Sequence, residues 1–409
     1  AYRLYDFCDS FTEYLSAAQK RSISPLLAGL DTSQPYGGYL ELLARYHTMP
    51  VLAAGYGFSS GRGAVELNCA PLTEEEQGER LVEVSRALEA DGWVGGFVST
   101  WQDEWERRSW NTAFAAVPTE HFLWHDLQTD SQNYGLMAFA PGEEAVCILD
   151  GDPSEWKPED LLLERDSLRL SARYDAEGLY LLLEGASREE PVYLPLDISP
   201  EMGSRFCDHP NLAFSRDVDF LLCVDGTDNS RLLVQERWDP LRERFLYETA
   251  GDDPFLDFPE PDSGVFVPIG MAVQNPLLVD MLTPEARALQ RLGVWETGKL
   301  THGNGNSEAE NYNSLADFCF GTGCVEIRIP WLLLNVGAPA SLLAHRDYYQ
   351  HYGVEFKQIR DIWIGATRDG EENGIPMESF RLKSWKSLEY RERLKESYYI
   401  MQAYWKGGN

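Results

Sequence analysis

Residues 92–112 read GWVGGFVSTWQDEWERRSWNT, an apolar run that leads directly into a segment of carboxylates and indoles. The run 93–100 contains paired glycines and suits a strand that is buried on both faces. The side chains that follow it are Trp101, Asp103, Glu104, Trp105 and Trp110. Indole faces stack on sugar rings, and carboxylates bind hydroxyl groups or transfer protons. The segment therefore predicts a sugar site at the end of a buried strand; the alternative is a packed loop whose charges are solvated.

Upstream of this segment, helical and strand patterns alternate. The predicted helices are 10–21, 36–47 and 73–90, and the predicted strands are 25–30, 49–57 and 93–100. Thr73 and Glu76 have the spacing of a capping box. Strands that alternate with helices indicate parallel pairing through right-handed crossovers. We expect a partial (β/α) barrel-like layer over residues 1–142, because a closed barrel needs about 250 residues. An upstream barrel segment or a partner domain would complete it, or the layer is open and rests on the next domain.

From residue 143 to residue 409 the pattern changes to short β-branched or alternating runs separated by Asp, Gly, Asn and Pro. The predicted strands are 167–174, 178–185, 217–225, 231–236 and 324–330. Two long insertions, 238–316 and 337–358, interrupt them, and 388–404 has the pattern of a terminal helix. The predicted fold class is thus α/β plus all-β, with an antiparallel β-sandwich that carries insertions and a C-terminal helix.

Composition narrows the class of partner. The formal net charge of −31 disfavours nucleic-acid binding, which needs clustered Lys and Arg. The negative charge is spread along the chain, as on a solvated acidic surface. The seven cysteines are scattered without a CxxC pair, so neither a disulfide framework nor a zinc site is indicated. No apolar run reaches the ~18 residues of a membrane span, and the start carries no signal-peptide pattern.

Five segments in the second half resemble the family nine carbohydrate-binding module and its DOMON-type relatives. They are DGDPSEW (150–156), RYDAEGLYLLLEG (173–185), DVDFLLCVDGTDNS (217–230), VEIRIPWLLLN (325–335) and DIWIGATRDG (361–370). The resemblance implies a β-sandwich, and relatives of this module often hold a structural calcium ion near such turns. Asp150, Asp152, Asp225 and Asp228 supply oxygen ligands of the kind that calcium prefers, although Asp is also an ordinary turn former.

The first half resembles the last third of a glycoside-hydrolase-like (β/α)8 barrel. Segments 47–63, 73–92 and 95–112 are similar to its seventh strand and loop, its seventh helix, and its eighth strand and loop. The barrel end followed by the sandwich is also similar to bacterial proteins often labelled family 2 glycosyltransferases, but no residue here shows nucleotide-sugar chemistry. In retaining enzymes of this barrel type, a glutamate nucleophile ends the seventh strand. Gly55 stands at the matching position.

Two functions follow from these patterns. The first is a carbohydrate-active protein in which Asp103 and Glu104 act as catalytic carboxylates, with Glu66 or Asp31 across the mouth. Trp101, Trp105, Trp110 and Arg62 would then bind an oligo- or polysaccharide. The second is a non-catalytic glycan-binding or polysaccharide-assembly accessory protein, which Gly55 favours because glycine cannot form a glycosyl-enzyme intermediate.

Overall fold

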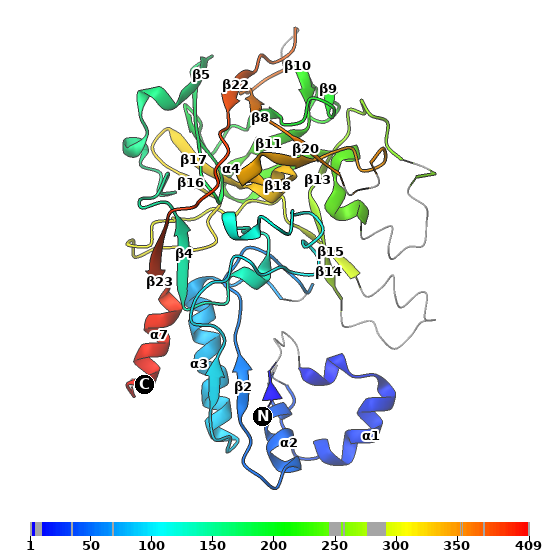
Figure 1. Ribbon diagram of the computed structural model, residues 1–409, viewed down its shortest axis with the longest axis vertical. Helices are drawn as coiled ribbons and strands as arrows, with labels where there is room; N and C mark the ends of the chain where they lie inside the picture. Colours follow the sequence, from blue (N-terminus) through cyan, green and yellow to red (C-terminus); the bar gives the residue numbers. More distant parts are fainter. Residues whose placement is uncertain are drawn as a thin grey trace.

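The structure is a computed structural model that describes residues 2–4, 10–33, 36–67, 69–244, 255–256, 258–275, 292–351, 353, 355–370 and 373–407. Its chain builds an α/β layer from the first hundred residues and two antiparallel sheets from the remainder (Figure 1). The fold is thus mixed, with helices and parallel strands at one end and β-sheets at the other. The described residues form no closed barrel, because the parallel sheet has three strands.

The α/β layer is a parallel sheet in the order β1-β2-β3. Its elements are β1 (Tyr2–Arg3), η1 (Phe11–Tyr14), α1 (Ala17–Leu27), α2 (Tyr39–Tyr46), β2 (Ala53–Tyr56), α3 (Glu74–Ala90) and β3 (Gly96–Val98). Residues 25–30, predicted as a strand, instead end α1 and continue into a turn. That prediction was wrong because a short apolar run fits a helix segment and a strand equally well. The third strand is β1, whose two residues are too few to show a period.

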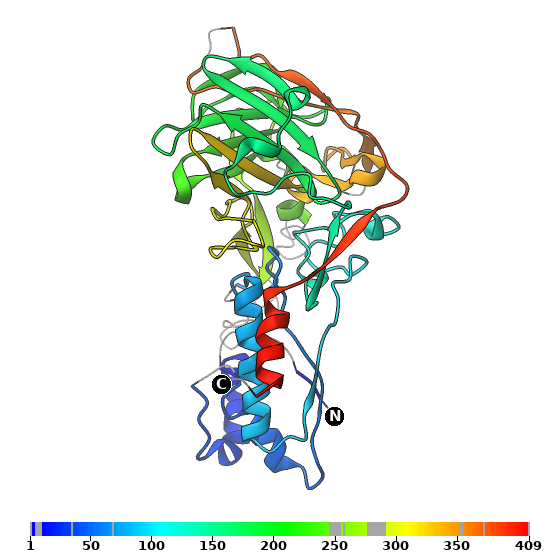
Figure 2. The ribbon, with the colours of Figure 1, turned by 90° about the vertical axis from the view of Figure 1, so that its left-hand side faces the viewer.

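Helix α3 begins at the predicted capping box. The Thr73 hydroxyl accepts a hydrogen bond from the Glu76 amide (3.1 Å), and the Glu76 carboxylate accepts one from the Thr73 amide (2.7 Å). Leu81, Val84 and Leu88 are buried along one face of α3. α7 (Glu396–Trp405), from the end of the chain, lies alongside α3 (Figure 2) and adds Met401 to the same core cluster.

The two antiparallel sheets confirm the expected all-β region. One sheet has the order β13-β12-β11-β8-β21-β22, and the other has the order β16-β17-β7-β6-β5. The strands of the first are β8 (Val192–Asp197), β11 (Phe220–Val224), β12 (Arg231–Gln235), β13 (Phe266–Pro268), β21 (Asp361–Ile364) and β22 (Glu378–Arg381). Those of the second are β5 (Leu161–Arg165), β6 (Leu168–Tyr174), β7 (Gly178–Glu184), β16 (Phe318–Phe320) and β17 (Cys324–Pro330).

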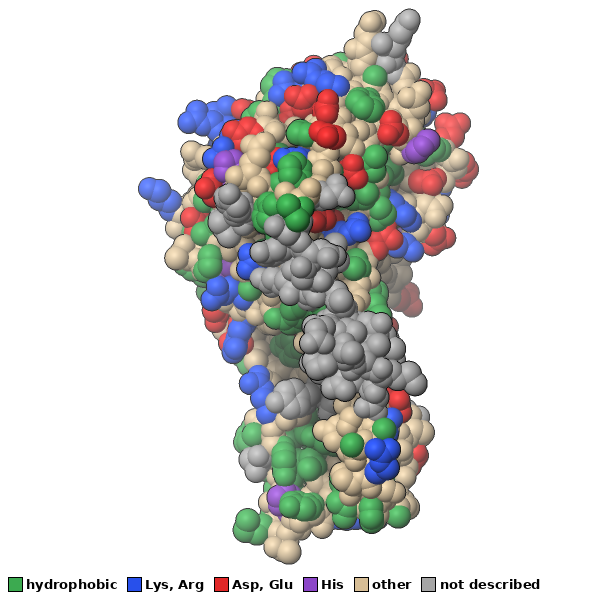
Figure 3. All heavy atoms as spheres, turned by 90° about the vertical axis from the view of Figure 1, so that its right-hand side faces the viewer, with side chains coloured by type: hydrophobic (Ala, Val, Ile, Leu, Met, Phe, Trp, Pro, Cys, Tyr) green, Lys and Arg blue, Asp and Glu red, His purple; other side chains and the backbone are tan. Residues whose placement is uncertain are grey.

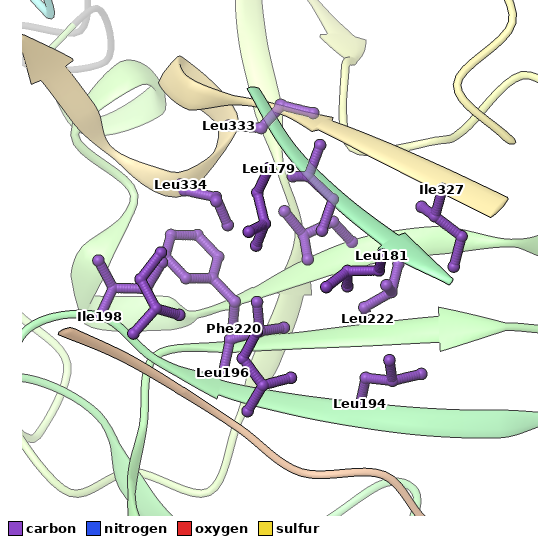
Figure 4. Packing of buried hydrophobic residues seen from close by; sticks show 14 of the residues in the cluster. Leu179, Leu181, Leu194, Leu196, Ile198, Phe220, Leu222, Ile327, Leu333 and Leu334 are labelled. Carbon is purple, nitrogen blue, oxygen red and sulfur yellow. The ribbon is translucent and has the colours of Figure 1, made fainter. Parts of the chain in front are cut away.

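The inner faces of the two sheets share one core. Figure 4 shows Leu179 and Leu181 of β7 beside Leu194 of β8 and Phe220 of β11, all fully buried. Each side chain of this size contributes about 1.5–3 kcal/mol when it leaves water. Because successive strand residues face opposite sides, a shift of one residue in register would expose this set. The core therefore fixes the pairing of the two sheets as a sandwich.

Additional short strands form small sheets outside the two main ones. They are β9 (Ser204–Cys207), β10 (Leu212–Val218), β14 (Gly270–Gln274), β15 (Leu292–Glu296), β18 (Val336–Ala338), β19 (Leu343–His345) and β20 (Phe356–Gln358), with the short helix α4 (Gly226–Asn229) between β11 and β12. The DGDPSEW segment is held by Glu326 of β17. Its carboxylate accepts hydrogen bonds from the amides of Asp150 and Gly151 and from the Trp156 indole, at 2.8–3.1 Å.

The chain returns to the α/β layer through one antiparallel ladder. β4 (Met137–Pro141) pairs with β23 (Tyr390–Leu394), and α7 follows β23 directly. The predicted helix over 388–404 is therefore helical only from Glu396 onward, because 390–394 pairs with β4 instead. The final elements thus contact the layer formed by the first hundred residues, although the proposed boundary lies at residue 142.

Charged side chains of both signs are interspersed over the sandwich on the face shown in Figure 3. Among the described residues, no helix is both long enough and apolar enough to cross a membrane. The free thiols are Cys147, Cys207, Cys223, Cys319 and Cys324. Cys69 is disulfide-bonded, which the scattered spacing of the cysteines does not predict.

Candidate functional site

A cavity of about 410 Å³ lies at the carboxyl ends of β1, β2 and β3. Its lining comes from residues that end these strands and from the loops that follow them: Arg3, Leu4, Gly55, Tyr56, Gly57, Ser99, Thr100, Glu104, Arg107, Arg108, Ser131 and Tyr134. We call it the strand-end cavity. α/β folds commonly bind ligands at the carboxyl edge of a parallel sheet, because the loops that follow the strands meet there and form a crevice.

Two glycines of β2 and its loop shape this cavity. A Cβ at Gly57 would lie 1.9 Å from the Ser99 carbonyl oxygen, so only glycine allows the two loops to approach this closely. A Cβ at Gly55 would lie 3.8 Å from its nearest neighbours, in Arg3 and Ser99, which is ordinary contact. Gly55 is therefore not required by local packing, and its missing side chain leaves room at the cavity wall.

Asp103 is buried in an ion pair. Its carboxylate lies 2.7 Å from the Lys395 ammonium and accepts the Gly135 amide at 2.8 Å. The exposed fractions of the two charged side chains are 1% and 3%. Lys395 also donates to the Ser60 hydroxyl (3.0 Å) and the Asn133 carbonyl (3.2 Å). Burial raises the pKa of Asp103 despite the opposing charge of Lys395. The pair links the loop after β3 to the start of α7.

Glu104 lies at the surface next to this pair. It forms two contacts with Arg107, at 3.0 and 3.3 Å. Among the described residues that line the strand-end cavity, Glu104 is the one carboxylate. Glu66 accepts the Tyr14 hydroxyl and Asp31 accepts the Ser33 amide, and neither lines this cavity. Hydrolysis by the usual glycosidase mechanism needs two facing carboxyl groups, and the described lining supplies one.

A groove of about 520 Å³ adjoins the loop on another side and shares Glu104 with the strand-end cavity. Its lining residues are Gln102, Asp103, Glu104, Trp105, Glu106, Phe122, Leu123, Phe139, Lys386, Ser387, Leu388 and Tyr390. We call it the aromatic groove. Phe122, from η2 (His121–Leu123), and Tyr390 of β23 are 61% and 56% exposed, so this groove presents two aromatic rings to solvent.

The predicted tryptophans are separated by the fold. Trp105 is buried beneath the aromatic groove, where its ring stacks on His125 at 5.3 Å with an interplanar angle of 8°. Trp101 is 54% exposed and touches Tyr398 of α7 edge-on. Trp110 is 38% exposed and lines neither the groove nor the strand-end cavity. The loop therefore presents its indoles in three directions.

Arg62 lies on the opposite side, between the α/β layer and an insertion of the sandwich. Its guanidinium donates to both oxygens of Asp317 (2.8 and 3.0 Å) and to the Thr297 carbonyl (2.8 Å). It is 9% exposed and borders a cavity of about 590 Å³ that is also lined by Trp295 and Asp228. Its donors are thus committed to protein acceptors, as in a structural ion pair.

The four aspartates considered for calcium lie in two separate turns. Asp150 accepts the Asp152 amide (3.0 Å) and the Asn306 side chain (3.2 Å), and Asp152 accepts the Ser154 amide (3.0 Å). These are turn contacts. Within the described part of the chain, the one cluster of potential metal ligands joins Cys147, Glu155 and Glu326. Glu326 accepts four hydrogen bonds there, one of them from the Cys147 thiol, and none of the four aspartates is a member of this cluster.

A buried network joins the loop region to the β6–β7 turn of the sandwich. His125 contacts Glu177 (3.0 Å) and Asn133 (2.9 Å), and the Tyr180 hydroxyl lies 3.2 Å from Asp175 and 3.3 Å from Glu177. Burial and the charge of Glu177 raise the pKa of Asp175 to about 7. His125 and Arg328 outweigh burial and lower the pKa of Glu177 to about 2. Of these two neighbouring carboxyl groups, Asp175 therefore holds its proton up to a higher pH than Glu177 does.

The residues that sequence reasoning missed are Lys395, Phe122, Tyr390, Arg3 and Arg108. Arg108 belongs to the loop after β3 itself, and Phe122 lies in η2, further along the chain. Arg3 reaches this loop through the parallel sheet, and Tyr390 and Lys395 reach it through the ladder of β4 with β23. Comparison of the chain with protein-family models, with curated proteins and with solved structures gives no match. The geometry of the two adjoining sites is therefore the basis for a functional proposal.

Proposed function

We propose that this protein binds a polysaccharide at the aromatic groove and does not hydrolyse it. The observation that carries the proposal is the exposure of Phe122 and Tyr390 over a groove with a polar rim of Glu104, Glu106 and Lys386. Aromatic faces supply apolar area for the C–H faces of sugar rings, and charged groups at the rim accept or donate hydrogen bonds to hydroxyls. Binding grooves of about 300–1,000 Å³ are typical for such ligands.

The state of the carboxylates supports binding over catalysis. Asp103 is neutralised by a buried lysine, Glu104 pairs with Arg107, and Glu106, the third carboxylate of the aromatic groove, comes from the same short loop rather than from a facing element. A glycosidase pair needs one acid and one base or nucleophile across the substrate. The parallel strands with a cavity at their carboxyl ends also support kinship with the end of a (β/α) barrel, in keeping with the sequence resemblance.

The experiment is a binding screen of the full chain against soluble neutral polysaccharides by affinity electrophoresis. Phe122→Ala and Tyr390→Ala should each weaken binding about tenfold, because a central aromatic contact contributes more than about 1 kcal/mol. Tyr46→Ala, at a ring that is 72% exposed on α2, serves as the control and should bind as the parent does. Parental affinity in both groove variants would overturn the proposal. Release of reducing sugar by the parent, lost in Glu104→Gln, would instead establish a hydrolase.

A further inference from the structure

The strand-end cavity has a charge opposite to that of the whole chain. Three arginines, Arg3, Arg107 and Arg108, line it together with one carboxylate, Glu104. Among the described lining residues, three positive charges and one negative charge leave a net charge of +2, in a chain whose formal charge is −31. A cavity wall of one sign concentrates counter-ions of the other sign. The lining therefore favours an anionic ligand.

Two of the three arginines are left without an internal ion pair among the described residues. Arg107 pairs with Glu104, while Arg3 and Arg108 form no ion pair with any residue in the described ranges. A guanidinium presents five donors in a plane that matches the two oxygens of a carboxylate or phosphate. In so acidic a chain, two arginines that converge on a cavity without carboxylate partners leave these donors for a ligand.

Neutral donors and free volume complete the cavity. Ser99 follows β3 directly and lines the cavity, as do Thr100, whose hydroxyl donates to the Gln102 carbonyl (2.6 Å), and Ser131, whose hydroxyl contacts that of Ser109 (3.1 Å). The empty position at Gly55, with 3.8 Å to its nearest side-chain atoms, widens the cavity next to Arg3. Hydroxyl groups beside guanidinium groups can bind both the anionic group and the ring hydroxyls of a sugar acid.

We propose that the strand-end cavity binds an anionic substituent, a carboxylate or a phosphate, of a glycan whose neutral rings lie in the adjoining aromatic groove. This inference rests on the proposed function, because the two sites share Glu104. It adds a ligand class, an acidic polysaccharide, and assigns Arg3 and Arg108 as the residues that select it.

The test compares matched polymers that differ only in charge. Polygalacturonate, its methyl ester and a phosphorylated mannan with its dephosphorylated form are titrated against the full chain at low ionic strength. We expect one acidic polymer to bind at least tenfold more tightly than its neutral counterpart. Arg3→Gln and Arg108→Gln should each remove most of that preference without changing affinity for the neutral polymer. If the two arginine variants lose the preference for polygalacturonate, the substituent is a carboxylate. If they lose the preference for phosphorylated mannan, it is a phosphate.

The control is Arg86→Gln, at an exposed arginine on α3 outside the cavity lining, and it should keep the parental preference. Equal affinity for acidic and neutral polymers, or an acidic preference that survives both cavity variants, overturns the inference. If the inference fails in this way but Phe122→Ala still weakens the binding of neutral polymers, the proposed function stands. Loss of the acidic preference in Arg86→Gln as well would show general attraction to the surface, which also overturns it.

Discussion

Removal of one partner from the Asp103–Lys395 ion pair should destabilise the protein strongly. Lys395→Met keeps the length of the side chain but deletes the ammonium, so the Asp103 carboxylate keeps only the Gly135 amide as a near donor. Asp103→Asn deletes the charge that balances a lysine with 3% exposure. Because an uncompensated buried charge remains, each change should cost about 3–5 kcal/mol.

The double variant Asp103→Leu with Lys395→Met distinguishes the interaction between the two charges from their other contacts. It removes both charges, so only the hydrogen bonds to Gly135, Ser60 and Asn133 are lost. We expect it to be less destabilised than either single variant, since apolar replacement of a whole buried pair is often neutral. Non-additivity of this size is the signature of a direct interaction.

The assay is urea unfolding followed by tryptophan fluorescence, with Glu104→Gln as the matched control. Glu104 takes part in an exposed pair, whose loss should cost less than about 1 kcal/mol. If Asp103→Asn unfolds at the parental urea midpoint, or if the two single effects add in the double variant, the reasoning is refuted. A catalytic Asp103 would show the reverse pattern, with parental stability and loss of a hydrolytic activity.

Three further variants test the fold around the site. Gly57→Ala should cost about 1–3 kcal/mol through the clash with the Ser99 carbonyl, whereas Gly55→Ala should melt close to the parent; equal melting temperatures would contradict the close loop approach. Asp175 has a folded pKa of about 7, above its ordinary value near 3.8, so its contribution to stability is present below about pH 4 and is lost as pH rises to 7. For one proton, the free energy of unfolding falls by up to about 1.4 kcal/mol per pH unit in this range, and Asp175→Asn should reduce that fall. Urea midpoints with the same pH dependence in the variant and the parent would contradict this prediction. Thr73→Ala should lower stability by about 1 kcal/mol, and no shift of the urea midpoint would show that the cap is dispensable.

Local patterns predicted those elements that carry a strong period or a cap. Helix α3 begins at Thr73 as its capping box predicts, and β6, β7 and β17 lie within one residue of the predicted runs. They were predictable because side-chain period and turn chemistry act over a few residues. β1 and β23 were missed, since two residues or a run next to a helix carry no period of their own; their pairing partners lie about 50 and 250 residues away in sequence.

The predicted loop after β3 borders two adjoining cavities, but the sequence did not determine what its residues do there. Asp103 and Glu104 are adjacent in sequence and differ in environment, because one points at Lys395 beneath the loop and the other at Arg107 on the surface. Their partners, and the arrival of Phe122 and Tyr390 at the same groove, depend on contacts between distant segments.

The sequence by itself determined a mixed chain with an α/β first part, an antiparallel second part, an acidic surface and a glycine at the end of β2. Those properties follow from composition, period and the identity of single residues. The tertiary structure alone decided that Lys395 neutralises Asp103, that Arg62 is committed to Asp317, and that Arg3 and Arg108 share a cavity. The physical reason is that charge, burial and hydrogen-bond partners are properties of neighbours in space, and most of these neighbours are hundreds of residues apart along the chain.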